Sequence, residues 1–87
     1  MLAEFVGQKV VVDLRSPFVC LGTLQRADEQ YMELNNADLH DLRDSQTTRE
    51  SYVTASRATG IKRNRRRVLI VRTEVVAVSR LEDVVDE

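Results

Sequence analysis

Residues 68–78 read VLIVRTEVVAV, two apolar runs on either side of Arg72, Thr73 and Glu74. Valine and isoleucine favour strands, so the stretch predicts two strands, 68–71 and 75–78, joined by a short turn. Neither run alternates apolar with polar residues, so each strand is apolar on both faces. One face can line an interior, but the other also has to be covered.

An 87-residue chain has few elements with which to cover that second face. Small domains bury a comparatively low fraction of their surface, and an apolar strand edge left unpaired invites aggregation. The simplest cover is a neighbouring copy of the chain, so the pattern predicts a homo-oligomer. The alternative is that a helix within residues 47–59 folds back over this face.

Upstream of this stretch the sequence predicts three more strands, and hence a mainly β fold. Residues 9–15 and 18–26 are rich in β-forming residues and are separated by a Ser-Pro turn. Gly22 allows a sharp bend or a close backbone approach in the second of these strands. A further turn and a third strand follow, the strand running from Tyr31 toward residues 39–42.

Two short helices are predicted outside the strands. Residues 2–6 can form one or two helical turns before Gly7. In the longer polar segment, Asp44 or Ser45 is a candidate N-cap for a helix over 47–59, and Gly60 is a candidate terminator.

Composition and charge limit the functional classes. Thirteen Lys or Arg and fourteen Asp or Glu residues give a net charge of −1, so overall charge does not indicate a nucleic-acid partner. Cys20 is the single cysteine, and we expect it to be a small buried side chain in a reducing compartment. The first residues lack the pattern of a secretory signal, and no apolar stretch approaches the ~20 residues of a membrane span. We therefore expect a cytoplasmic protein with no membrane partner.

Two segments resemble the motifs of the Sm-like (LSm) family. The first motif is similar to residues 7–12, 22–24 and 28–34, and the second to 68–78, where the family has an apolar strand, Arg-Gly and another apolar strand. The resemblance covers residues 2–34 and 68–81. It implies a small, strongly bent five-stranded antiparallel barrel of Sm-like or SH3-like type behind a short N-terminal helix.

The resemblance also implies how the chain is organised and assembled. Residues 1–87 would be one domain, with 44–67 as an insertion-like polar and basic connection and 82–87 as an acidic tail. Family members close hexameric or heptameric rings by pairing the fourth strand of one subunit with the fifth strand of the next.

Single-stranded RNA binding at the inner rim of the ring is a further implication. Tyr31 matches the stacking side chain, Arg72 the arginine of Arg-Gly, and Asp28 the acidic residue of the turn, with one extra residue in that turn. An aromatic ring and a guanidinium can hold an unstacked base between them, which contributes about 1–3 kcal/mol per base. The alternatives are a half-buried Tyr31 without a ligand, a turn-forming Asp28, and an Arg72 that is simply a turn residue or pairs with Glu74 or Glu33.

Two positions depart from the family pattern. Glu33 stands where the family has an asparagine, and Thr73 stands where it has a glycine. A carboxylate accepts hydrogen bonds but cannot donate them, so the uridine readout of the family does not carry over unchanged. Glu33 could instead accept from the amino groups of cytosine or guanine, or pair with Arg72 and close the site.

A basic run lies in the connection before the fourth predicted strand. Its five cations are Lys62, Arg63, Arg65, Arg66 and Arg67. Arginines bind phosphate oxygens bidentately and gain affinity through counterion release, so the run predicts phosphate contacts on a loop away from the rim. The alternative is a solvated loop whose charge is balanced by Asp38, Asp41, Asp44 and the acidic tail.

Three functional classes compete. The leading hypothesis is a non-catalytic ring that binds RNA through the rim and the basic run, and the second is an oligomeric protein-interaction scaffold that has lost RNA recognition. An enzyme is disfavoured, because the sequence has no catalytic constellation and no glycine-rich phosphate loop. His40 lies near Asp38 and Asp41 without metal-ligand spacing, so we expect a surface side chain and no metal, cofactor or small-molecule substrate.

Overall fold

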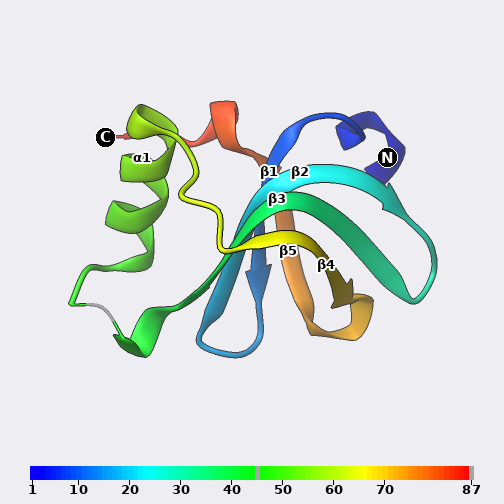
Figure 1. Cartoon of the computed structure of the whole chain (residues 1–87), viewed down its shortest axis with the longest axis horizontal. Coiled ribbons are helices and arrows are strands. Elements are labelled where there is room, and N and C mark those ends of the chain that lie inside the picture. The colour runs from blue at the N-terminus through cyan, green and yellow to red at the C-terminus, as the bar shows by residue number, and fades with distance from the viewer. Residues whose placement is uncertain (45, 87) are drawn as a thin grey trace.

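Five strands form one antiparallel sheet in the computed structural model, which describes residues 1–44 and 46–86. In chain order the elements are η1 (Leu2–Phe5), β1 (Lys9–Leu14), β2 (Phe18–Ala27), β3 (Tyr31–Asp41), η2 (Leu42–Asp44), α1 (Arg49–Thr59), β4 (Arg65–Val71), η3 (Arg72–Glu74), β5 (Val75–Arg80) and η4 (Leu81–Asp83). The strands lie in the order β4-β3-β2-β1-β5, and the sheet curls until β5 passes behind β3 and β4 (Figure 1). The predicted mainly β, five-stranded antiparallel fold is confirmed.

The main core lies inside the curl of the sheet. Its buried members include Val10, Val12, Leu24, Met32, Leu34 and Ile70. Val68, Val75 and Val78 of the C-terminal stretch pack against this core. One face of each C-terminal strand is therefore covered within a single chain.

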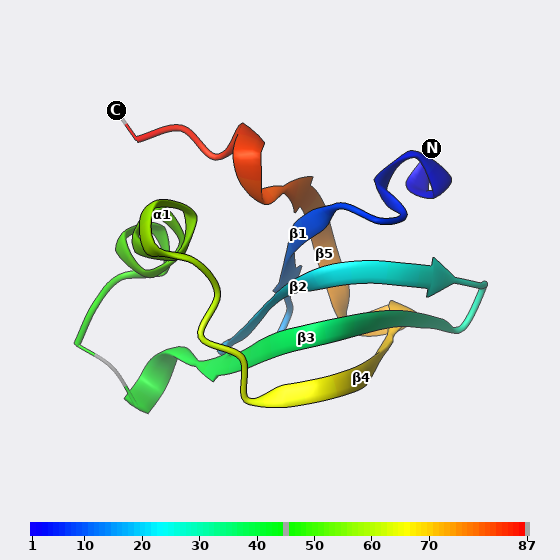
Figure 2. The same cartoon turned by 45° about the horizontal axis from the view of Figure 1, so that its top comes forward.

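A second, smaller core lies on the outer face of β1 and β2, beneath α1. Val11, Val19 and Leu21 are buried there against Val53 of α1 and Leu81 of η4. Because Val10 and Val12 face the main core, the unbroken valine run of β1 has both of its faces covered. Figure 2 shows α1 at the end of the molecule away from the β2–β3 turn.

The alternative in which this helix covers the C-terminal strands is wrong. Leu69 and Val71 of β4 are each 47% exposed, and Val76 of β5 is 65% exposed. β4 and β5 are also the two edges of the sheet, each paired with one neighbour only. The second apolar face of this stretch thus stays uncovered in the single chain.

Gly22 lies where the backbones of β2 and β3 come close. A Cβ at this position would lie 3.0 Å from the Cβ of Ala37 and 3.1 Å from the carbonyl oxygen of Asn35. The β2–β3 register also shifts beside it, between Leu21 and Thr23. The close backbone approach that the sequence predicts is confirmed.

Helix α1 begins later than predicted. Its N-cap is Thr48, whose side chain accepts a hydrogen bond from the Ser51 amide at 3.1 Å. Asp44 belongs to η2, so the Asp44 cap is wrong, and Ser45 lies outside the described residues. Gly60 ends the helix with a φ of 98°, a conformation that favours glycine, as predicted. None of the helices in residues 1–44 and 46–86 has the length and apolar character needed to cross a membrane.

Candidate nucleic-acid interface

The β2–β3 turn and the β4–β5 connection meet at one end of the molecule. The Asp28 carboxylate accepts hydrogen bonds from the amides of Gln30 at 2.8 Å and Tyr31 at 2.7 Å, which closes the turn. These two bonds, that of Tyr31 first, hold the pKa of Asp28 below its ordinary value. The turn-forming role of Asp28 is therefore present in the structure.

Arg72 joins the two loops through backbone groups. Its amide donates to the carbonyl of Gln30 at 2.8 Å, and its guanidinium donates to the carbonyl of Asp28. Among the described residues, no ion pair links Arg72 to Glu33 or Glu74, so the predicted pairing with either carboxylate is wrong. Thr73 is exposed in η3, next to this junction.

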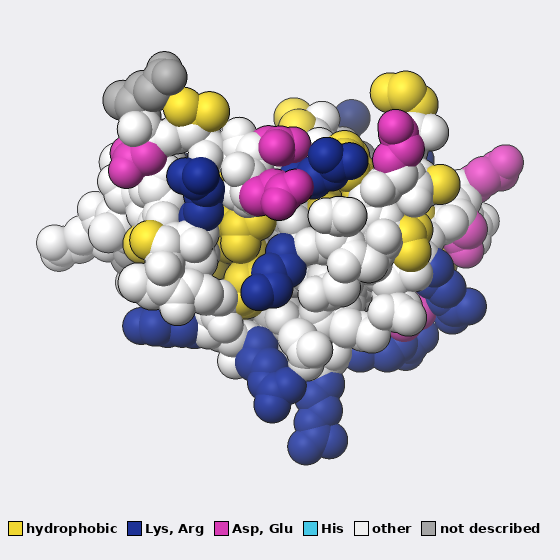
Figure 3. Space-filling model, turned by 90° about the horizontal axis from the view of Figure 1, so that it is seen from above, with side chains coloured by type: hydrophobic (Ala, Val, Ile, Leu, Met, Phe, Trp, Pro, Cys, Tyr) yellow, Lys and Arg dark blue, Asp and Glu magenta, His cyan; other side chains and the backbone are white. Residues whose placement is uncertain are grey.

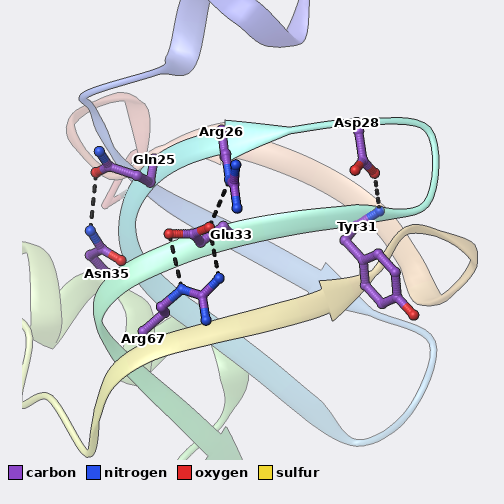
Figure 4. Close-up of polar contacts among 7 residues, drawn as sticks. All are labelled: Gln25, Arg26, Asp28, Tyr31, Glu33, Asn35 and Arg67. Carbon is purple, nitrogen blue, oxygen red and sulfur yellow. Dashed lines mark hydrogen bonds and ion pairs between the residues drawn. The ribbon is translucent and has the colours of Figure 1, made fainter.

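Tyr31 begins β3 opposite Val71 of β4, and 42% of its surface is exposed. Figure 4 shows its ring projecting from the strand toward the end of β4. It lines a pocket of about 240 Å³ together with Arg26, Ala27, Asp28, Glu33 and Leu69. Arg72 lines a different hollow, beside Met1 and Leu2. Whether either residue contacts RNA stays a prediction.

Glu33 is held between two arginines on the outer face of the sheet (Figure 4). Its Oε1 accepts from Arg26 Nε at 2.8 Å and from Arg67 at 3.2 Å, and its Oε2 lies 3.1 Å from Arg67 Nε. These bonds, that of Arg67 first, lower the pKa of the carboxyl group. Only 8% of Glu33 is exposed. Glu33 is therefore paired with Arg26 and Arg67, and not with Arg72 as the sequence analysis had suggested.

Sequence reasoning missed Arg26 as a site residue. Arg26 and Glu33 are cross-strand partners in the β2–β3 hairpin. The Asp28 amide donates to the Tyr31 carbonyl, and counting outward from that four-residue turn, 28–31, places these opposite charges face to face. The predicted turn at 28–30 would instead have placed Gln25 opposite Glu33. Arg67 reaches the same carboxylate diagonally from β4, where it pairs with Asn35.

The basic run divides between a connection and a strand. Lys62 and Arg63 precede β4, but Arg65, Arg66 and Arg67 are its first residues, so a loop over the whole run is wrong. Pairing with Asn35 and Ala37 of β3 draws these arginines into the sheet in spite of their modest β propensity.

Most of the run lacks an acidic partner. In the described part of the chain, no ion pair joins Lys62, Arg63, Arg65 or Arg66 to a carboxylate. Asp41 instead pairs with Arg43 at 2.8 Å, and Asp38 accepts from Tyr52 and from Asn64, the latter at 3.0 Å. In Figure 3 most visible Lys and Arg side chains lie toward the lower margin, and most Asp and Glu side chains lie in the upper half. Because basic and acidic side chains are separated in this way, several cations can contact phosphate even though the net charge of the chain is −1.

His40 is not the free surface residue that was predicted. Its ring stacks on Tyr52 of α1, with centroids 4.0 Å apart and planes 9° apart. Its Nε2 is buried without a hydrogen-bond partner among the described residues. The stack attaches α1 to β3.

Comparison with known proteins identifies the fold. No family model matches the chain, and no curated protein matches it. Among solved structures, the chain is similar to the Pyrococcus abyssii Sm protein in complex with a uridine heptamer, at 17% identity and a TM-score of 0.63, over 91% of this chain and 90% of that one. It is also similar to a chain of the NatC complex bound to CoA, at 18% identity and a TM-score of 0.56, over 90% of this chain and 80% of that one. The chain therefore has the Sm-like fold.

Proposed function

We propose that the protein is a non-catalytic, ring-forming module that binds single-stranded RNA. The observation that carries this proposal is an exposed aromatic ring, Tyr31, at the junction of two loops that also carries an arginine. At the other end of β4 lies a run of five cations, of which only Arg67 has an acidic partner among the described residues. Stacking on aromatic rings and salt-dependent phosphate contacts are the two usual components of single-strand binding. The structural neighbour in complex with a uridine heptamer supports the same function.

Assembly into a ring is proposed on the two sheet edges. β4 and β5 each lack a second neighbour, and both carry exposed apolar side chains. Pairing β4 of one copy with β5 of the next would cover Leu69, Val71 and Val76, and would remove both edges in a closed ring of six or seven copies. We propose a cytoplasmic location on the sequence alone, because a single cysteine fits a reducing compartment.

The test measures particle mass and RNA binding together. Native mass spectrometry should give a closed oligomer, and a labelled single-stranded RNA should show anisotropy that falls as salt rises. Tyr31→Ala should weaken binding by roughly 5- to 150-fold, from about 1–3 kcal/mol per stacked base. Arg66→Ala should lower the salt slope by about one, whereas Arg43→Ala, which removes an arginine already paired with Asp41, should change it less. Anisotropy that stays at baseline in low salt would refute RNA binding.

An oligomeric protein-interaction scaffold is the second candidate. Glu33 occupies the place of the family asparagine and has both oxygens bound by arginines, which disfavours the usual uridine contact. The likeness to a chain of the NatC complex also favours a role among proteins. In that case Tyr31→Ala and Arg72→Ala would leave function intact, while changes within residues 44–60 would impair it.

A further inference from the structure

The pocket beside Tyr31 presents hydrogen-bond donors. Two acidic side chains line it, Asp28 and Glu33. Glu33 already accepts two hydrogen bonds from Arg26 and Arg67 and forms a further ion-pair contact with Arg67. Asp28 Oδ1 accepts from the backbone amides of Gln30 and Tyr31. A guanidinium has five N–H groups, and Arg26 uses only the one on Nε for Glu33. Within residues 1–44 and 46–86, the two terminal nitrogens of Arg26 make no hydrogen bond or ion pair. They remain available to a ligand in the pocket that Arg26 lines.

The contacts of Glu33 also fix the direction of this donor pair. Arg67 binds the carboxylate through two nitrogens, and the carboxylate in turn holds Arg26 through its Nε. The bond from Nε to Glu33 occupies one side of the Arg26 guanidinium. Its two terminal nitrogens lie on the other side, where their N–H groups form a two-pronged donor, or fork, that can bind a ligand. The fork belongs to a side chain with 74% of its surface exposed, which leaves room for a ligand.

The shape of the pocket suits one flat ring system. Its volume of about 240 Å³ lies below the ~300–1,000 Å³ of sites for drug-sized molecules. Tyr31 supplies an aromatic face and Leu69 an apolar contact, and both line the pocket. A base stacked there would turn one polar edge toward Arg26.

We propose that this pocket reads guanine in single-stranded RNA, with Arg26 donating to O6 and N7 and Tyr31 stacking on the ring. Guanine presents those two acceptors side by side, and a guanidinium fork matches them. Adenine replaces O6 with an amino donor, and cytosine presents an amino donor at the corresponding place. The inference rests on the proposed RNA-binding function and assigns Glu33 and Arg67 a positioning role.

The experiment compares short single-stranded RNAs that are uridine throughout except at one central position. That position carries guanine, adenine, or 7-deazaguanine, which keeps O6 and lacks N7. We expect guanine to bind roughly 5- to 150-fold more tightly than adenine, as for a bidentate base contact, and 7-deazaguanine to lose most of that advantage. Arg26→Gln and Arg26→Lys should both remove the preference, because neither retains the fork.

Arg43→Gln is the matched control, since Arg43 pairs with Asp41 on β3 through Nε and a terminal nitrogen away from the pocket. It should keep the guanine preference, and circular dichroism should find every variant folded. Equal binding of the three RNAs by the wild type would overturn the guanine inference while leaving RNA binding in place. The same holds if Arg26→Gln weakens all three equally, which would make Arg26 a phosphate contact. Failure of every RNA to bind would instead remove the proposed function.

Discussion

Introducing a charge at Val76 should break the ring that we propose. Fully burying a valine contributes about 1.5–3 kcal/mol, and Val76 is 65% exposed in the single chain. Covering it in an interface is therefore worth roughly 1–2 kcal/mol per contact. In Val76→Asp this gain is lost, and a carboxylate without a partner adds at least the roughly 1–3 kcal/mol of desolvation cost of an unpaired polar group. The sum, about 2–5 kcal/mol, lowers the association constant of each pair of subunits roughly 30- to 4,000-fold. In a closed ring the substitution weakens every interface by this amount.

Analytical ultracentrifugation at low micromolar concentration measures the outcome. The wild type should sediment as a closed oligomer, and Val76→Asp as a folded monomer. Val85→Asp is the control, because Val85 has the same 65% exposure but lies beyond η4, outside the sheet. A monomeric wild type, or a Val76→Asp variant that keeps the wild-type mass, would refute the reasoning from the uncovered edge.

Three further predictions concern the single chain. Gly22→Ala should lower the free energy of unfolding by about 1–3 kcal/mol, because the new methyl group would lie 3.0 Å from Ala37; an unchanged urea midpoint would contradict this. The pKa of Glu33 is lowered in the folded state by Arg67 and Arg26, so its stabilising effect is present above its ordinary value of 4.5 and is lost as pH falls through the folded pKa. The stability difference between the wild type and Glu33→Gln, from urea titrations, should therefore shrink on acidification. Burial raises the pKa of Cys20 to about 12, so a thiol reagent at mildly alkaline pH should react with it only as fast as the protein unfolds.

Much of the sheet was predictable because its residues carry strong local signals. The β-formers and the turns between them located all five strands, and the glycine that permits the tight approach of β2 to β3 was recognised. The start of β4 was missed, because Arg65, Arg66 and Arg67 have no strand signal of their own. Their conformation follows from pairing with β3, a contact between residues about thirty positions apart in the chain.

The candidate site was harder to predict, because partners in an ion pair depend on register. Glu33 was recognised as a departure from the family pattern, but its partners are set by the β2–β3 hairpin and by β4. The sequence analysis named Arg72 as a possible partner of Glu33, but the Arg72 guanidinium donates to the backbone carbonyl of Asp28 instead. His40 was misjudged for a similar reason, since its stacking partner Tyr52 comes from a helix whose position no local pattern determines.

Helix α1 explains how the fold can cover one apolar face and leave another free. The outer face of β1 and β2 would expose Val11, Val19 and Leu21 without α1, which buries all three within the same chain. The outer faces of β4 and β5 receive no such cover. Since α1 also lies away from the β2–β3 turn (Figure 1), it blocks neither the sheet edges nor the pocket beside Tyr31. A helix in this connection can therefore stabilise the chain while leaving both proposed contact surfaces open, and the exposed apolar residues of β4 and β5 are ones that a second copy could cover.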